Sequence, residues 1–425
     1  MRSYWRFLTI LFLWTAACWL VIGGLLRPLL PGGWLTVLGA ALLCAAPSLW
    51  LVRSRGRSIY PSALSRLWLA RPFWYAQLFM PLLALSGLLG ILAGLPFGAG
   101  GMAGRWALGG AAVLLGALGV AGYAGARRLV VRRLDAGVED LPPGLEGMRI
   151  VQVSDLHVGP HTSRRHLARV AAAVRDARPD LIAITGDQVD DYARDVEPFA
   201  AAFHGLAAPL GVFAIAGNHD VYAGWPAVHR GLEAMGITVL VNRAVEVERN
   251  GARFWVAGTG DPAGRRGTPA APVAPDIERT LADVPSGAFT LALAHNPALW
   301  PALAERGVEL TLSGHTHYGQ IAIPRLGWSL ASPFVEHAMG GHQIDGSQLY
   351  INPGTNYWAI PFRIGTPPEV TVLTLRRAKT AALRPSPHQE ATRAMASLSC
   401  SSPTGLTRCS LKPASLLRFR SSSMP

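Results

Sequence analysis

Lysine and cysteine are scarce in this chain of 425 residues, and neither occurs in its central segment, residues 136–375. The two lysines and four cysteines are Lys379, Lys412, Cys18, Cys44, Cys400 and Cys409. Their positions exclude a disulfide framework or a thiolate metal site from the central segment. Any metal bound there must be held by oxygen and imidazole ligands.

Acidic residues are also scarce, but only at the two ends. Residues 1–135 carry 13 Arg against one acid, residues 136–375 carry 17 Arg against 24 acids, and residues 376–425 carry nine basic residues against one acid. The three segments therefore contribute +12, −7 and +8 to the net charge of +13. Because the central segment is acidic, bulk charge does not equip it to bind a phosphate backbone, and we expect no nucleic-acid partner.

Charged residues and histidine are missing from four long apolar blocks in the first third of the chain. Each block is close to the roughly 20 residues that cross a bilayer as a helix. The blocks are Phe7 to Leu26, Trp34 to Val52, about Phe73 to Phe97, and Trp106 to Ala126. A cleaved signal peptide is the alternative for the first block, but this block is long for a signal peptide and three more apolar blocks follow it. We predict four membrane helices that act as an anchor, since ion or proton transport has no residue to use.

Arginines near these blocks favour one side of the membrane. Eleven of those flanking the blocks fall on one predicted side, and only Arg27 and Arg105 fall on the other. By the positive-inside rule both ends of the four-helix region face the cytoplasm, and so does the domain that follows.

Five strand-like apolar runs each end in Asp, Asn or His. In chain order the ends are Asp155-Leu156-His157, Gly186-Asp187-Gln188-Val189-Asp190, Gly217-Asn218-His219-Asp220, His295, and Gly314-His315-Thr316-His317. Ligands of open α/β sheets bind where strands end, so we expect these side chains to gather there. A carboxylate in the position of Asp187 can bridge two metals.

From Met148 onward, predicted strands alternate with helices, and hairpins are predicted at Asn250-Gly251 and Asp345-Gly346. This mixture predicts an α/β domain of two packed mixed β-sheets flanked by helices. The expected organisation is a four-helix transmembrane region at 1–135, a linker at 136–147, the α/β domain at 148–375, and a disordered basic Ser/Pro-rich tail at 376–425.

The ordered motifs resemble those of the calcineurin-like metallophosphoesterases over roughly residues 148–375. Residues 314–321, Pro353-Gly354-Thr355, Arg363 and Pro368-Glu369-Val370 resemble the membrane-anchored bacterial branch, in which Tyr318 is usually glycine. That branch includes enzymes similar to the UDP-2,3-diacylglucosamine pyrophosphatases of lipid A biosynthesis. The resemblance implies a bacterial inner (plasma) membrane protein and a bilayer-embedded substrate.

The resemblance also implies a role for each polar residue at the strand ends. One metal is held by Asp155, His157 and His317, the other by Asn218, His295 and His315, and Asp187 bridges them. The catalytic pair is His219, which stabilises or protonates the leaving-group oxygen, and Asp220, which orients it. The cofactors are two divalent metal ions, and the donor set suits Mn, Fe, Zn or Ni.

The expected function is hydrolysis of a phosphodiester or pyrophosphate bond by a metal-activated water, on a lipid-linked substrate such as a UDP-diacyl amino sugar. The alternatives are a phosphodiesterase or phosphatase for soluble substrates, a non-catalytic scaffold, and a lipid or solute carrier regulated by the domain. The sequence does not indicate an oligomeric state.

Two interpretations apply to each group of residues beside the motifs. Asp190 is either a support of the metal ligands or a solvated turn residue. For His161, Arg164 and Arg165 a solvated helix start is favoured over phosphate contact. For Asn356, Tyr357 and Trp358 an ordinary turn is favoured over a substrate loop.

Overall fold

The computed structural model describes residues 2–56, 62–160, 162–266 and 273–385. Residues Met1–Arg384 form one unit by their contacts. Most of the predicted disordered tail, from residue 386 onward, and His161 lie outside the described residues.

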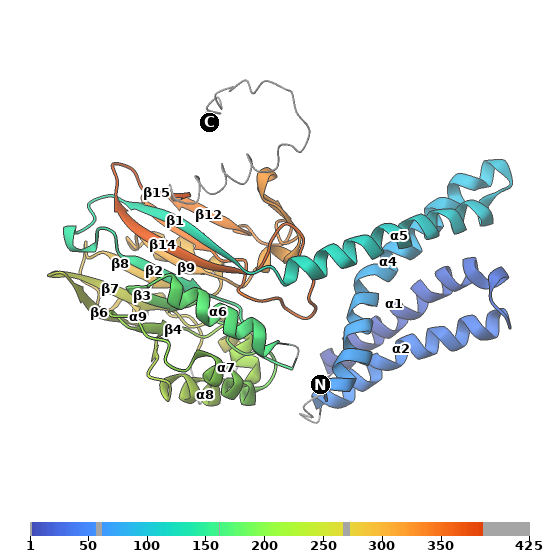
Figure 1. Cartoon of the computed structure of the whole chain (residues 1–425), viewed down its shortest axis with the longest axis horizontal. Coiled ribbons are helices and arrows are strands. Elements are labelled where there is room, and N and C mark those ends of the chain that lie inside the picture. The colour runs from blue at the N-terminus through green and yellow to red at the C-terminus, as the bar shows by residue number, and fades with distance from the viewer. Residues whose placement is uncertain (1, 57–61, 161, 267–272, 386–425) are drawn as a thin grey trace, which may run out of the picture. The chain divides into compact units, whose positions relative to one another are not determined.

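The first third of the chain is helical, as its apolar blocks predict (Figure 1). Its long helices are α1 (Arg2–Leu26), α2 (Trp34–Gly56), α4 (Arg71–Gly94) and α5 (Gly100–Ala126), and the one-turn helix α3 (Ala63–Ser65) precedes α4. Three segments of the described residues are long and apolar enough to cross a membrane: Thr9–Leu29, Leu67–Phe97 and Gly100–Ala126. In α2 the apolar part within the described residues, Trp34–Pro47, is shorter than a full span. The fourth membrane helix therefore stays a prediction.

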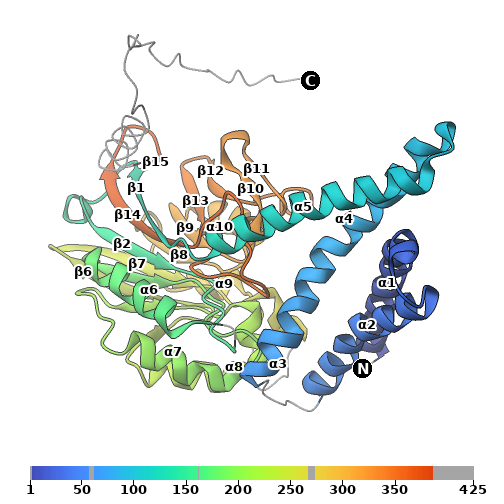
Figure 2. The same ribbon diagram turned by 45° about the vertical axis from the view of Figure 1, so that its right-hand side comes forward.

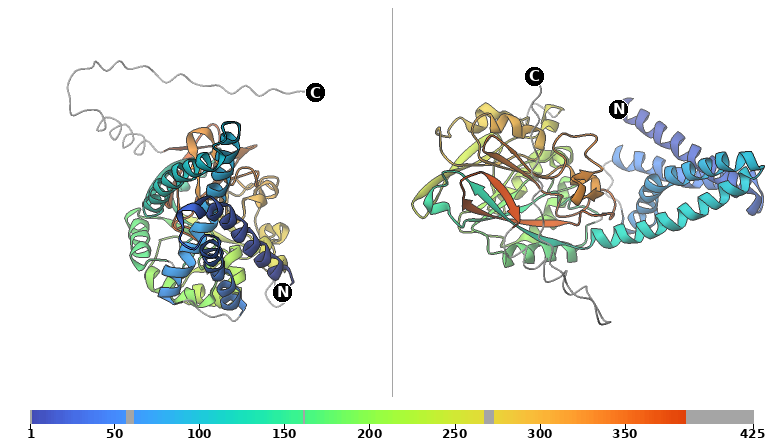
Figure 3. Two further views of the ribbon diagram at one scale, coloured as in Figure 1. Left: turned by 90° about the vertical axis from the view of Figure 1, so that its right-hand side faces the viewer. Right: turned by 90° about the horizontal axis from the view of Figure 1, so that it is seen from above.

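Helices α4 and α5 run side by side, as Figures 1 and 3 both show. Small residues permit this approach: a Cβ added to Gly90 of α4 would lie 2.6 Å from Cβ of Ala107 and 2.9 Å from Cα of Gly104. Small residues at helix contacts are typical of membrane helices, which associate by close packing of their backbones.

The rest of the described chain forms two large β-sheets and a small two-stranded sheet. The seven-stranded sheet has the order β15-β1-β14-β2-β3-β4-β5, and the six-stranded sheet has the order β12-β13-β9-β8-β7-β6. The strands of the first sheet are β1 (Val130–Val138), β2 (Arg149–Val153), β3 (Leu181–Ile184), β4 (Val212–Ala214), β5 (Thr238–Val239), β14 (Glu369–Arg377) and β15 (Ala382–Pro385). Those of the second are β6 (Arg243–Arg249), β7 (Ala252–Gly258), β8 (Thr290–Leu293), β9 (Leu310–Ser313), β12 (Gly340–Ile344) and β13 (Ser347–Ile351), and β10 (Ala322–Ile323) pairs with β11 (Trp328–Ser329).

Helices cover the outer face of each large sheet, which gives four layers (Figures 1 and 2). The helices are α6 (Arg164–Asp176), α7 (Val196–Phe203) and α8 (Asn218–Glu233) on the seven-stranded sheet, and α9 (Ile277–Leu281) and α10 (Trp300–Ala304) on the six-stranded sheet. Alternation along β2 explains the layering: Val151 packs in the cluster under α6 to α8, whereas Ile150 packs in the cluster between the sheets. Two packed mixed sheets flanked by helices are therefore confirmed, as are both predicted hairpins.

The domain is longer at both ends than residues 148–375. Strand β1 begins at Val130, in what we predicted to be the membrane region and linker, and it pairs in parallel with β14. Beyond residue 375, β14 continues to Arg377 and β15 is a further strand. The basic composition of β1 concealed the strand in the sequence. Arg132 Nε of this strand lies 2.6 Å from Glu369 Oε2, and its charge offsets the cost of burying that carboxylate.

Candidate metal centre

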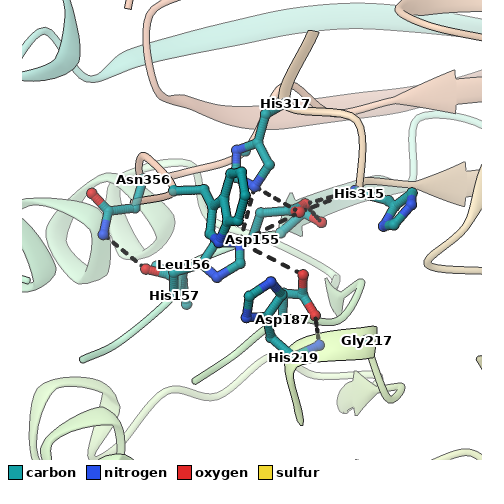
Figure 4. Close-up of polar contacts among 12 residues, drawn as sticks. Asp155, Leu156, His157, Asp187, Gly217, His219, His315, His317 and Asn356 are labelled. Carbon is teal, nitrogen blue, oxygen red and sulfur yellow. Dashed lines mark hydrogen bonds and ion pairs between the residues drawn. The ribbon is translucent and has the colours of Figure 1, made fainter. Parts of the chain in front are cut away.

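The five predicted strand ends meet at one place in the fold. Strands β2, β3 and β4 are parallel neighbours in one sheet, and β8 and β9 are parallel neighbours in the other. A hydrogen bond from Gln152 Nε2 to the carbonyl of Ser313, 2.9 Å long, links β2 to β9 across the two sheets. The side chains that follow the strands consequently surround one region (Figure 4).

Glycine is required before two of these polar residues because neighbouring side chains leave no room for a Cβ. A Cβ on Gly217 would overlap the carboxylate of Asp187, and one on Gly314 would overlap the side chains of Ser154 and Asp155. The close approach lets backbone amides reach the carboxylates. The amide of His219 donates to Asp187 Oδ1 at 2.8 Å, and that of His315 donates to Asp155 Oδ1 at 3.0 Å.

Most of the predicted ligands have a backbone in the left-handed region, which residues other than glycine rarely adopt. The residues with positive φ are Asp155 (52°), His157 (41°), Asp187 (51°), His315 (70°) and His317 (49°). Such backbones are concentrated at functional sites, where the surrounding fold offsets a strain of about 1–3 kcal/mol each.

One buried group consists of Asp155, His157 and His317. Nε2 of His157 lies 2.9 Å from Nε2 of His317, which lies 3.3 Å from Oδ1 of Asp155. Asp187 Oδ2 is 3.6 Å from the same nitrogen of His157. These three residues, predicted to hold one metal, are thus together, with the predicted bridging carboxylate beside them.

The second predicted group surrounds the amide of Asn218. Its Oδ1 lies 2.9 Å from Nδ1 of His315 and 3.3 Å from Nε2 of His295. That His295 nitrogen is also 3.3 Å from Asp187 Oδ2. The other ring nitrogen of His295 donates to the carbonyl of Thr185 at 2.8 Å, so it is Nε2 that faces the cluster. Asp187 is consequently adjacent to both groups, as a bridging ligand must be.

Electrostatics make His315 and His317 neutral imidazoles, whereas Asp187 and His295 form a charged pair. Burial lowers the pKa of His315 to about 4, helped by the charge of His295, and burial also holds the pKa of His317 well below its usual value. Burial opposes ionisation of Asp187, but His295 and His157 nevertheless hold its pKa well below its usual range. Burial likewise disfavours the charged form of His295, yet Asp187 and Asp155 raise its pKa well above the usual value.

This donor set fits a divalent cation. Within the described residues, ligand atoms of Asp155, His157 and His317 lie within 4.8 Å of one another, as do those of Asp155, Asp187 and His295. Nδ1 of His157 lies 3.3 Å from Oδ1 of Asp190, so it is Nε2 of His157 that faces the cluster. Carboxylate and imidazole donor atoms point toward a shared centre, where a positive charge would stabilise them. A metal cation can contact several of these ligands at once, which a proton on one ligand cannot do.

Asp190, rather than Asp220, supports His219. The backbone carbonyl of Asp190 lies 3.0 Å from Nδ1 of His219. The carboxylate Oδ1 of Asp190 lies 3.3 Å from this nitrogen and also 3.3 Å from Nδ1 of His157. Asp220 accepts from the amides of Gly217 and Val189 at the start of α8, so the prediction that it orients His219 was wrong. Helix geometry explains the error, because consecutive residues of a helix point in different directions.

The metal cluster opens into a pocket of about 330 Å³ that Trp358 also lines. The indole of Trp358 is half exposed, and its ring centroid lies 5.9 Å from that of His219. Asn356 is buried and donates from Nδ2 to the carbonyl of Leu156, beside the first motif (Figure 4). Of residues 356–358, for which the sequence favours an ordinary turn over a substrate loop, only Trp358 lines this pocket.

Arg363 is a member of the site whose contacts the sequence did not reveal. It is fully buried, its Nη1 donates to the carbonyl of Pro353 at 2.6 Å, and its Nη2 lies 2.9 Å from Nδ1 of His317. Its backbone amide donates to the carbonyl of Gly122 in α5 at 2.8 Å. One residue thus connects a membrane helix to a predicted metal ligand.

Comparisons with known proteins agree with this geometry. Residues 148–319 match the family model described as calcineurin-like phosphoesterase. The metallophosphoesterase YkuE of Bacillus subtilis (strain 168) is 32% identical over 241 residues, which cover 56% of this chain and 82% of the relative. The chain belongs to the calcineurin-like metallophosphoesterases. A "transmembrane protein with metallophosphoesterase domain" from Danio rerio is 33% identical over 252 residues, which cover 57% of this chain and 56% of the relative.

As a metallophosphoesterase, the chain has a divalent metal site in the cluster of His and Asp residues, and its apolar helices and transmembrane relatives indicate membrane association. Relatives with a transmembrane region occur in vertebrates, so this arrangement is not confined to bacteria. The alignment spans only about half of the vertebrate relatives. Among solved structures, the NAD nucleotidase of Haemophilus influenzae is 15% identical, covers 49% of this chain and 45% of its own, and has a TM-score of 0.36.

Proposed function

We propose that this metallophosphoesterase uses two divalent ions to hydrolyse a phosphodiester or pyrophosphate bond of a lipid in its own membrane. The observation that carries the hydrolytic part is the position of Asp187, whose Oδ2 lies 3.3 Å from His295 and 3.6 Å from His157, one residue from each predicted ligand group. A carboxylate so placed suits a two-metal site.

The residues of this chain then have distinct tasks. Asp155, His157 and His317 would hold one ion, and Asn218, His295 and His315 the other, with Asp187 shared. When bound, such ions lower the pKa of water and offset the charge that develops on the phosphoryl group. His219 lies on the pocket wall and would give a proton to the leaving oxygen as its bond to phosphorus breaks and the water oxygen bonds to phosphorus. Asp190 would keep the ring of His219 in place.

Apolar exposure around the pocket supports a lipid substrate. Gly319 and Gln320 line the pocket, and the segment that follows them exposes large apolar side chains, among them Leu326, Trp328 and Phe334. Exposed apolar side chains on one segment often mark contact with lipid or with another apolar partner. Arg363 contacts His317 of the pocket, and its hydrogen bond to α5 keeps this contact next to the membrane helices.

A matched pair of variants tests the metal chemistry. Asp187→Ala should lose bound metal and hydrolysis of a generic aryl phosphodiester together. His219→Ala should keep both metals yet lose most turnover, since general acid catalysis contributes about 10²- to 10⁴-fold. Metal analysis and kinetics on the same preparations check both outcomes. Full activity of Asp187→Ala would sink the two-metal proposal, and metal loss in His219→Ala would make that residue a ligand.

A second experiment tests the substrate class. The full-length enzyme should cleave a diacylated nucleotide sugar, such as a UDP-diacyl amino sugar, with a higher kcat/KM than its deacylated counterpart. If the acyl chains give no gain while both compounds are hydrolysed, a soluble phosphodiester is the substrate. This result leaves the metal chemistry intact and removes only the lipid assignment.

We further propose that the chain resides in a bacterial inner membrane with its catalytic domain in the cytoplasm. The support is the excess of arginines on one side of the predicted spans. A cytoplasm-only reporter fused after Arg128, two residues beyond the end of α5, should be active, and a periplasm-only reporter there should be silent. The reverse pattern would place the domain outside the cytoplasm.

A further inference from the structure

A second cavity lies where the membrane helices meet the catalytic domain. It has a volume of about 280 Å³, close to the lower end of ligand pockets, ~300 Å³. Its walls come from the start of α4, the end of α5, the first turns of α6 and the loop at residues 356–361. It shares no lining residue with the metal pocket.

The cavity is strongly basic. Four arginines line it: Arg71, Arg127, Arg165 and Arg169. No Asp or Glu is among the described residues of its wall. His166 also lines it, but burial lowers the pKa of its imidazole, which lies 2.9 Å from the carbonyl of Thr355, so the positive charge is that of the guanidinium groups.

Arg127 and Arg169 are held in place by groups other than carboxylates. The guanidinium of Arg127 lies 4.4 Å from the ring centroid of Tyr123, and Arg169 Nη1 donates to the carbonyl of Arg127 at 3.0 Å. Within the described parts of the chain, Arg127, Arg165 and Arg169 form no ion pair with a carboxylate. Their charge is therefore available to an anion, and planar guanidinium groups match the oxygens of a phosphate.

The position of the cavity indicates the source of the anion. The span that includes α4 starts at Leu67 and the span of α5 ends at Ala126, so Arg71 and Ala126 lie at the same end of two candidate spans. Lipid headgroups lie at this depth, and basic pockets between membrane helices on the cytoplasmic side bind anionic headgroups.

We propose that this cavity binds the phosphate group of an anionic phospholipid. The site is separate from the metal centre and goes beyond the proposed catalytic function. Its occupant would also contact the loop that both pockets share, since Asn356 and Tyr357 line the basic cavity whereas Trp358 lines the metal pocket. A bound lipid would thereby hold one wall of the metal pocket in position.

Native mass spectrometry of the full-length protein in detergent tests the proposal by measuring the equilibrium binding of three probes. The probes are a short-chain phosphatidylglycerol, a phosphatidylcholine with the same chains, and inorganic phosphate. Phosphatidylglycerol should bind about tenfold or more tightly than phosphatidylcholine, because its phosphate charge is not offset within the headgroup. Equal binding of the two lipids would overturn the proposal. The proposal would also be overturned if inorganic phosphate competed for the cavity as strongly as the lipid does, because the cavity would then be a site for free phosphate.

Variants of α6 locate the binding. Arg165→Gln and Arg169→Gln should each weaken phosphatidylglycerol binding by about tenfold, the loss expected for one charge-assisted hydrogen bond. Arg175→Gln is the matched control, because Arg175 is an exposed arginine of the same helix that does not line the cavity. It should bind the lipid as the unaltered chain does. An equal loss in Arg175→Gln would show that general surface charge, and not the cavity, attracts the lipid.

Discussion

Gly314 shows how closely the metal centre is packed at the level of single residues. A Cβ at this position would overlap Ser154 Oγ and Asp155 Oδ2. We expect Gly314→Ala to displace the Asp155 carboxylate and to lower metal content and activity together. Gly109→Ala is the control, since an added Cβ there meets nothing within 4 Å. Metal analysis checks the outcome, and normal metal content in Gly314→Ala would show that the carboxylate can move without cost.

The two aspartates near His219 should differ in what they control. Asp190 contacts the imidazoles of His219 and His157, so Asp190→Asn should lower kcat at saturating metal by about 10- to 100-fold. Asp220 accepts two backbone amides at the start of α8, so Asp220→Ala should mainly lower the melting temperature, at a cost of about 1–2 kcal/mol. Kinetics and melting curves of both variants check this. A larger loss of kcat in Asp220→Ala would restore it as the partner of His219.

Contacts of the Tyr318 side chain stabilise an unfavourable backbone conformation of this residue. Its φ of 54° lies in the left-handed region, which residues other than glycine rarely adopt. The buried hydroxyl donates to the carbonyl of Ile351 at 2.6 Å and accepts from the amide of Gly340 at 2.9 Å. These bonds and the burial of the ring offset the strain, and they attach the loop after His317 to β13 and β12.

At the scale of elements, helix α5 and the loop at residues 361–363 are in direct backbone contact. A Cβ on Gly125 would overlap the carbonyl of Arg363, the residue whose guanidinium lies beside His317. Gly125→Val should push this loop away and lower kcat/KM by about tenfold or more, because small displacements of catalytic groups are costly. The measurement is hydrolysis of a soluble aryl phosphodiester by the full-length protein in detergent.

Gly116→Val is the matched control for that prediction. Gly116 lies in the same helix, and a Cβ there meets nothing within 4 Å. It should leave kcat/KM unchanged. Equal activity of both variants would mean that the contact between α5 and Arg363 has no bearing on the metal centre.

Elements and clustered polar residues that depend on local pattern could be predicted from the sequence. Each apolar run that ends in Asp, Asn or His became a strand whose end faces the metal cluster, because strand formation and the polarity of its end are both visible locally. The contacts of Arg363 were not visible, since His317 and Gly122 lie far from it in the chain. The partner of His219 was missed for a similar reason, because Asp190 reaches it from another loop.

At the scale of the whole molecule, β1 decides where the catalytic domain begins. It pairs with β14 along nine residues, and it buries Leu134, Ala136 and Val138 between the sheets. Without β1, the buried Glu369 would also lose Arg132. Only residues 127–129 separate this strand from α5, so the connection between the membrane region and the catalytic domain is very short.

A version that starts at Gly147 should therefore fail to fold, whereas one that starts at Arg128 should fold and bind metal. Loss of the buried side chains of β1 alone removes about 5 kcal/mol, which is comparable to the whole stability of an ordinary domain, ~5–15 kcal/mol. Circular dichroism melting and metal analysis of the two purified versions measure the difference. Cooperative melting at the same temperature in both versions would show that β1 is dispensable and that the catalytic domain begins after residue 147.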